Sequence, residues 1–139
     1  MKRLLAVTGL VLLALPACMI TERQATTDLP GTAWVLVDLD GAEPVEGAVP
    51  TLEFGDDDTV SGWSGCNSFS GEVAIDGNEL SFGPLATTRM ACVDPAAAEQ
   101  ETTFLLTLEA AESYTIDSEG RLVLEGAEPL TFEVAPEGG

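Results

Sequence analysis

The side chains able to carry chemistry in this sequence are limited in kind. Its 139 residues include no histidine, which excludes Ser-His-Asp and Cys-His catalysis, histidine general bases and the commonest zinc and copper sites. The three cysteines are Cys18, Cys66 and Cys92. If Cys18 is lipidated, Cys66 and Cys92 form an even pair in an oxidising compartment, which favours a disulfide over free thiols or a metal site. We expect that disulfide, and neither a bound metal nor a cofactor.

Acidic residues are plentiful, but none of them has the spacing of a known carboxylate site. Asp56-Asp57-Asp58 lacks the alternating spacing of a calcium loop and is typical of a solvated hairpin tip. Glu101 falls on the apolar face of an expected helix, where a lone buried carboxylate would cost on the order of several kcal/mol. It either pairs with Arg89 or reaches water at the rim. Asn67, which follows Cys66, is expected to turn the chain or hold neighbouring backbone groups. Arg89, Glu101 and Asn67 are therefore the candidate ion pair or pocket.

The overall charge is strongly negative. There are 24 acidic and 5 basic residues, for a formal net charge of −19. Lys2 and Arg3 lie in an expected leader, whose removal leaves three arginines against the 24 acids, or −21. A surface of this charge excludes nucleic-acid partners and disfavours adsorption to an anionic bilayer. Membrane attachment would have to be covalent or through an inserted segment.

The N-terminal segment is typical of a lipoprotein leader. Residues 1–17 combine a short basic start, a twelve-residue apolar run from Leu4 to Leu15 and a small residue before Cys18, a pattern that resembles a bacterial lipobox. The alternative is an ordinary secretory leader that leaves Cys18 as a free thiol. We expect residues 18–28 to be a flexible, lipid-anchored tether. The protein would then be exported and held at the bacterial cell envelope, on the periplasmic side of the outer membrane in a Gram-negative source.

Residues 29–136 predict one mainly β domain. Short apolar stretches alternate with Gly, Asp and Pro about every ten residues, and Asp76-Gly77 and Ser118-Glu119-Gly120 are hairpin turn signals. Asp94 and Pro95 predict the start of a helix that runs to about Ala111 and lies against the sheet or plugs a barrel. We expect nine strands, at 33–39, 51–54, 59–64, 72–75, 79–82, 86–90, 113–116, 121–125 and 130–134. The expected apolar helix face comprises Ala97, Phe104, Leu105, Leu108 and Ala111.

Several segments in this order resemble a known family. They are Gly-Thr-Ala-Trp at 31–34, Gly-Cys-Asn-Ser-Phe-Ser-Gly at 65–71, Leu-Ala-Thr-Thr-Arg-Met-Ala-Cys at 85–92, and the helix with Glu-Gln-Glu at 99–101. Together they are similar to the META domain, also called the HslJ-like family. The resemblance implies a small antiparallel β barrel or cracked barrel with one helix, found in bacterial envelope lipoproteins and carrying no established catalytic residue set.

Three function hypotheses follow from the sequence. The first is a non-enzymatic, lipid-anchored envelope domain that supports membrane integrity or stress resistance through an unidentified envelope protein or a structural role. The second is a β barrel that binds a small apolar ligand or lipid near Trp34, Phe69 and the helix face. The third, a carboxylate enzyme such as a glycosidase, ranks last because plentiful exposed acids are no sign of a paired catalytic site.

Overall fold

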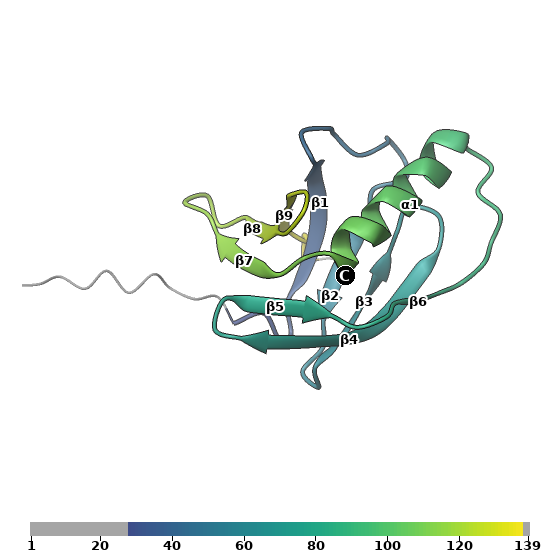
Figure 1. Ribbon diagram of the computed structural model, residues 1–139. Helices are drawn as coiled ribbons and strands as arrows, with labels where there is room; N and C mark the ends of the chain where they lie inside the picture. Colours follow the sequence, from purple (N-terminus) through teal and green to yellow (C-terminus); the bar gives the residue numbers. More distant parts are fainter. Residues whose placement is uncertain (1–27, 138–139) are drawn as a thin grey trace, which may run out of the picture.

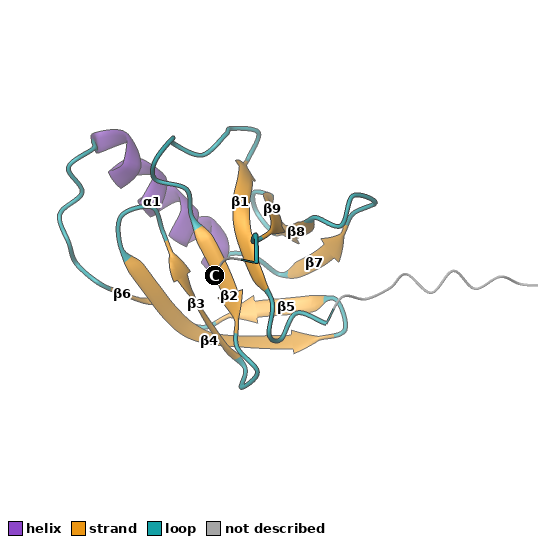
Figure 2. Cartoon of the chain, turned by 180° about the vertical axis from the view of Figure 1, so that it is seen from behind, coloured by secondary structure: helices purple, strands orange, loops and turns teal. Residues whose placement is uncertain are grey.

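The computed structural model describes residues 28–137, so the expected leader, Cys18 and nearly all of the tether lie outside the described residues. The described chain forms nine strands and one helix (Figures 1 and 2). Their bounds are β1 Ala33–Leu39, β2 Thr51–Phe54, β3 Thr59–Trp63, β4 Ser68–Asp76, β5 Glu79–Phe82, β6 Ala86–Thr87, α1 Pro95–Glu109, β7 Ser113–Ile116, β8 Leu122–Glu125 and β9 Leu130–Val134.

Eight of the strands close into an antiparallel barrel. The order around the sheet is β3-β2-β1-β9-β8-β7-β5-β4, and β4 pairs back with β3 from Thr59↔Glu72 to Trp63↔Ser68. The short β6 adds to β4 beside this ring. The weakest joint is between β5 and β7, which share the single register pair Glu79↔Ser113. Closure gives almost every strand two neighbours, which removes the exposed edges of an open sheet.

The start of helix α1 is set by a capping side chain and a proline. The Asp94 side chain accepts a hydrogen bond from the Ala96 backbone N–H at 2.9 Å, and Pro95 occupies the first turn, where its missing N–H costs nothing. The helix ends at Glu109, two residues before the expected end. It crosses one side of the barrel, in front of the strands in Figure 1 and behind them in Figure 2.

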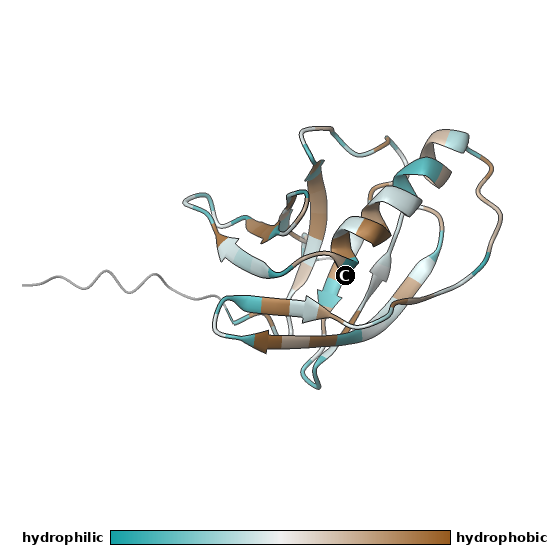
Figure 3. Cartoon of the chain, in the orientation of Figure 1, coloured by the Kyte–Doolittle hydropathy of each residue, from teal (hydrophilic) through white to brown (hydrophobic). Residues whose placement is uncertain are grey.

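The helix fills the barrel interior with an aromatic side chain. Phe104 is fully buried, with its ring centroid 5.8 Å from that of Phe69 on β4 and 6.4 Å from that of Phe132 on β9. Strands β4 and β9 are four positions apart around the eight-strand ring, so Phe104 bridges opposite walls. In Figure 3, β1 is hydrophobic along much of its length, whereas the hairpin tips are mostly hydrophilic. The other fully or nearly fully buried apolar side chains include Leu36, Leu52, Val60, Leu108, Leu122, Leu124 and Leu130.

The expected mainly β fold with one helix is confirmed, with two strand bounds that differ from the expected ones by more than one residue. Strand β4 begins at Ser68 rather than Glu72, because pairing with β3 carries a Ser- and Gly-rich stretch that propensity disfavours. Strand β6 ends at Thr87 rather than Met90, because the Met90 backbone N–H donates to the Asn67 side chain instead of to a strand. Within residues 28–137, no helix has the length and apolarity needed to cross a bilayer.

Candidate functional site

A tight bend between β3 and β4 forms the centre of the polar site. Ser64 is buried and its backbone N–H donates to the Asn67 carbonyl at 2.8 Å, which closes the bend. Between them, Gly65 has a φ of +99°, and a Cβ there would lie 2.5 Å from the Ala48 carbonyl oxygen. Both the positive φ and the close approach require glycine at this position. The bend therefore depends on the Gly-Cys-Asn sequence itself.

The carboxylate of Glu101 is held in this bend by neutral donors. Its Oε2 accepts from the Asn67 backbone N–H at 2.8 Å and from the Ser64 hydroxyl, and its Oε1 accepts from Asn67 Nδ2 at 2.9 Å. Of the two arrangements expected for Glu101, the ion pair with Arg89 is absent within residues 28–137, whereas Glu101 is partly exposed, as expected for a residue at the rim. The helix turns this partly buried carboxylate toward the bend, where backbone and side-chain donors offset the cost of desolvation.

Asn67 joins the bend and the helix to the segment that follows β6. Its Oδ1 accepts from the Met90 backbone N–H at 2.7 Å and from the Thr88 hydroxyl at 3.0 Å. Its Nδ2 also lies 3.3 Å from the Met90 carbonyl oxygen, as a donor. This buried side chain thus links its own bend to two stretches of chain that are distant from it in sequence. The structure supports the interpretation of Asn67 as a residue that holds neighbouring backbone groups.

The Cys66–Cys92 disulfide lies beside this network. The two Cα atoms are 5.7 Å apart and the residues are separated by 26 positions. Both cysteines are partly exposed, and their sulfur atoms and a carboxylate oxygen of Glu101 lie within 4.8 Å of one another. Cys66 precedes Asn67 and Cys92 follows Met90 by two residues, so the covalent link and the Asn67 hydrogen bonds join the same two segments.

A second helix residue, Gln100, fixes a loop on the other side of the bend. Its Oε1 accepts from the Val45 backbone N–H at 2.6 Å, and its Nε2 donates to the Ala48 carbonyl at 2.7 Å. Gln100 is buried, and these two bonds attach the β1–β2 connection to α1. Sequence reasoning named neither Gln100 nor Ser64 as a site residue. A buried amide or hydroxyl that hydrogen-bonds backbone groups leaves no periodic pattern in the sequence. Their positions, beside Glu101 and beside the Gly-Cys-Asn segment, were the available signal.

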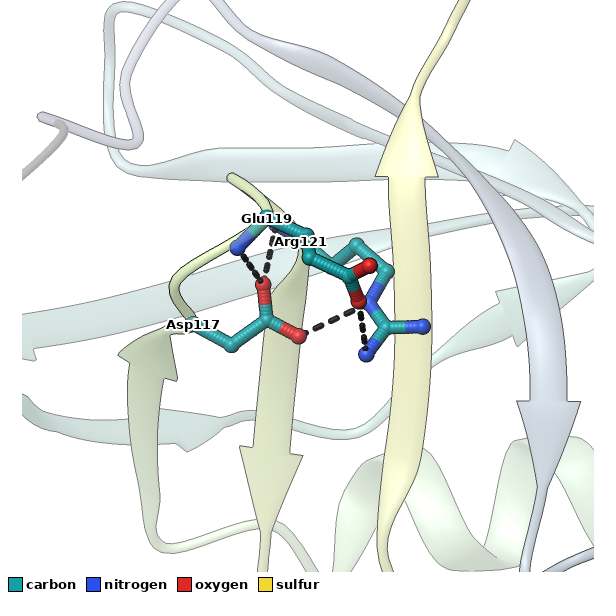
Figure 4. A network of polar contacts seen from close by, with 3 residues as sticks. All are labelled: Asp117, Glu119 and Arg121. Atoms are coloured by element: carbon teal, nitrogen blue, oxygen red, sulfur yellow. Dashed lines mark hydrogen bonds and ion pairs between the residues drawn. The ribbon is translucent and has the colours of Figure 1, made fainter.

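The two described arginines have different surroundings. Arg121 pairs with Asp117 and Glu119, each at 2.7 Å (Figure 4). The Arg121 backbone N–H, and then its side chain, donate to the Asp117 carboxylate and lower the pKa of Asp117. Arg89 is exposed, and within residues 28–137 it makes no ion pair. The expected Arg89–Glu101 pair is therefore not formed, because the neutral donors of the bend already surround the carboxylate.

The three consecutive aspartates occupy the place expected of them. Residues 56–58 form the exposed turn between β2 and β3, where the Gly55 N–H donates to the Thr59 carbonyl at 2.8 Å. Asp58 has a φ of +57°, a conformation that aspartate tolerates better than most residues. This is a hairpin tip, as predicted.

Comparison with known proteins assigns this chain to a family. A model of the META domain matches residues 27–137. The chain belongs to the META domain family. It is also 30% identical over 139 residues to heat shock protein HslJ of Escherichia coli K12, a match that covers 97% of both chains. The resemblance identified from the sequence motifs is therefore confirmed.

Solved structures share the architecture of this META domain. An NMR structure of a protein from Burkholderia xenovorans is 30% identical with a TM-score of 0.64, covering 78% of this chain and 85% of that one. A second NMR structure is 32% identical with a TM-score of 0.63, covering 76% and 91%. A DUF4847 family protein from Bacteroides vulgatus has a TM-score of 0.53 at 15% identity, covering 80% and 96%, and shares the fold alone.

Proposed function

We propose that this META domain is a non-enzymatic, lipid-anchored protein of the bacterial cell envelope that supports envelope integrity under stress. It would act through an envelope protein partner or a structural role. The observation that carries the proposal is the filled barrel. Phe104, Phe69 and Phe132 pack across the interior, and Trp34 is buried with them. A barrel filled by its own side chains offers other molecules its outer surface.

The same packing argues against the second sequence hypothesis, a barrel that binds a small apolar ligand. That hypothesis placed the ligand near Trp34, Phe69 and the apolar helix face. These side chains are 2%, 3% and, for Phe104, 0% exposed, so a ligand of even a few carbon atoms would have to displace the core. The pocket between Ile75 and Glu112, for example, is an open depression on the surface of the domain.

Separate observations support the lipid anchor and the role under envelope stress. The lipobox-like sequence before Cys18 supports an anchor, and residues 19–27 would connect it to the domain. The relative in Escherichia coli is named a heat shock protein, which supports a role when the envelope is stressed. The Cys66–Cys92 disulfide fits an exported location, because such bonds persist in oxidising compartments.

A genetic complementation experiment tests the proposal. The gene is deleted from its source bacterium and replaced by wild type, by Cys18→Ser or by an empty vector. Membrane fractionation, survival after heat shock and uptake of a hydrophobic dye by the envelope are then measured. We expect only wild type to be found in the membrane pellet and to restore both survival and the permeability barrier. Full retention of Cys18→Ser in the pellet would refute the anchor, and an unchanged deletion strain would refute the envelope role.

A further inference from the structure

Two cysteines and one carboxylate meet at the surface of this domain. The sulfur atoms of Cys66 and Cys92 and an oxygen of Glu101 lie within 4.8 Å of one another, and all three residues are partly exposed. They come from the β3–β4 bend, the segment before α1 and the second turn of the helix. We propose that, when the disulfide is reduced, these three side chains form a binding site for a thiophilic divalent cation such as zinc or cadmium.

The frame that positions the ligands does not depend on the sulfur–sulfur bond. Asn67, the neighbour of Cys66, binds both the Met90 backbone N–H at 2.7 Å and the Glu101 carboxylate at 2.9 Å. These bonds join the same three segments that carry the ligands, so they retain the cysteines and the carboxylate together after reduction.

The distances suit tetrahedral coordination. A Zn–S bond of about 2.3 Å and a tetrahedral angle place two sulfur ligands about 3.8 Å apart. The Cα atoms of Cys66 and Cys92, 5.7 Å apart, allow that separation by side-chain rotation alone. Two thiolates and one carboxylate leave a fourth position for water. The Met90 carbonyl oxygen, 4.0 Å from the Cys66 sulfur, is a second candidate for it.

The carboxylate is already oriented and carries a charge that no described cation balances. Within residues 28–137, Glu101 accepts bonds only from Ser64 and Asn67, which are neutral, and belongs to no ion pair. Its Oε1 accepts a single hydrogen bond and keeps a lone pair for a metal. Donors that fix a ligating carboxylate in this way raise metal affinity, and thiolate ligands select zinc and cadmium over magnesium or calcium.

Reduction of the Cys66–Cys92 disulfide requires a reductant, which we take to be a dithiol protein. A thiol–disulfide oxidoreductase in its dithiol form transfers two electrons and two protons to the disulfide, yielding the Cys66 and Cys92 thiols and its own disulfide. Binding of the cation then releases those two protons to solvent as the thiolates coordinate. In the oxidised protein the sulfur lone pairs are poor ligands. The site therefore couples metal binding to the redox state of this pair and is independent of the proposed envelope function.

Cadmium titration of the full chain tests the inference. All forms carry Cys18→Ser, so that only Cys66 and Cys92 contribute thiols. The protein is reduced, freed of reductant without oxygen and titrated with cadmium, and the thiolate-to-cadmium charge-transfer band and the released protons are measured. We expect one cadmium and two protons per reduced chain, and no band from the oxidised chain. Absence of stoichiometric binding by the reduced chain would overturn the proposal.

Variants and spectroscopy assign the third ligand. Glu101→Gln should weaken cadmium binding about tenfold or more, whereas Glu99→Gln, at an exposed position on the same helix, should bind like the reference. Equal affinity of these two variants would exclude Glu101. Should Glu101→Gln fail to fold, X-ray absorption of the zinc-loaded reference chain decides. Two sulfur neighbours and two lighter ones support the site, and a shell of four sulfurs from two chains overturns it.

Discussion

At the scale of single residues, the Asn67 side chain holds together segments that are far apart in the sequence. One side chain serves the helix through Glu101 and the β6–α1 segment through Thr88 and Met90. Removing it leaves a partly buried carboxylate short of a donor and a backbone N–H without its acceptor. Unsatisfied groups of this kind cost about 1 to 3 kcal/mol each.

We therefore predict that Asn67→Ala lowers the free energy of unfolding by about 2 to 4 kcal/mol. Urea denaturation measures the loss, with Asn78→Ala at an exposed hairpin position as the control. Asn67→Asp should be worse at neutral pH, because it places a second carboxylate against Glu101. Because that repulsion requires both carboxylates to be ionised, the stability of this variant should recover as the pH falls. Wild-type stability in Asn67→Ala would contradict the role assigned to the side chain.

A second residue-scale effect concerns Glu128. A hydrogen bond with Asp40, together with the negative charge of that carboxylate, raises the pKa of Glu128. A group whose folded-state pKa is raised contributes stability at low pH that is lost as the pH rises through that value. We predict that Glu128→Gln raises the melting temperature at pH 7 and reduces its fall between about pH 4 and 7. Glu46→Gln, on another exposed loop, is the control, and equal pH profiles of the two variants would refute the pairing.

At the scale of elements, the helix α1 stabilises the barrel mainly by placing the Phe104 ring between β4 and β9. Phe104 is fully buried, whereas Leu106 on the same helix is 63% exposed. We predict that Phe104→Ala costs about 3 to 5 kcal/mol of stability and that Leu106→Ala changes it by less than about 0.5 kcal/mol. Chemical denaturation followed by tryptophan fluorescence compares them. Similar losses in the two variants would mean that the helix only covers the barrel and does not fill it.

The disulfide is the other element-scale constraint. Its 26-residue separation encloses β4, β5 and β6, and closing such a loop stabilises a domain by roughly 3 to 4 kcal/mol through the unfolded state. The Cys66→Ser, Cys92→Ser double variant should melt lower than wild type. Reductant should lower the melting temperature of wild type and leave the double variant unchanged. Two alkyl adducts on oxidised, unreduced protein in mass spectrometry would instead indicate free thiols.

The sequence predicts the elements of this fold better than their polar connections. Hairpin signals such as Gly77, with a φ of +62°, and the Asp94–Pro95 helix start act locally, so they can be read from neighbouring residues. The partner of Glu101 was not predictable in this way. Asn67 lies 34 positions away from Glu101. Charge alone favours an arginine over a neutral amide as the partner of a carboxylate. The pairing of β1 with β9 is similarly set by residues far apart in the sequence, such as Val35 and Glu133.

At the scale of the whole molecule, the dominant feature is unbalanced negative charge. Of the two described arginines, Arg121 is paired locally with Asp117 and Glu119, so it offsets little of the repulsion elsewhere. Carboxylates are exposed on most of the loops, including the hairpin tip at 56–58. A compact state brings these charges closer than the unfolded chain does, and the repulsion destabilises it.

We predict that the melting temperature rises as sodium chloride is increased from about 0.01 M to 0.1 M, where the screening length falls from about 30 Å to about 10 Å. Sucrose at equal osmolality is the control for a general solvent effect. The Arg121–Asp117 attraction is weakened by the same salt and opposes the rise, so Arg121→Gln should melt lower at low salt and respond more steeply. A flat or falling melting temperature in wild type would show that the acids are too dispersed to repel one another, and that the net charge does not limit the stability of the fold.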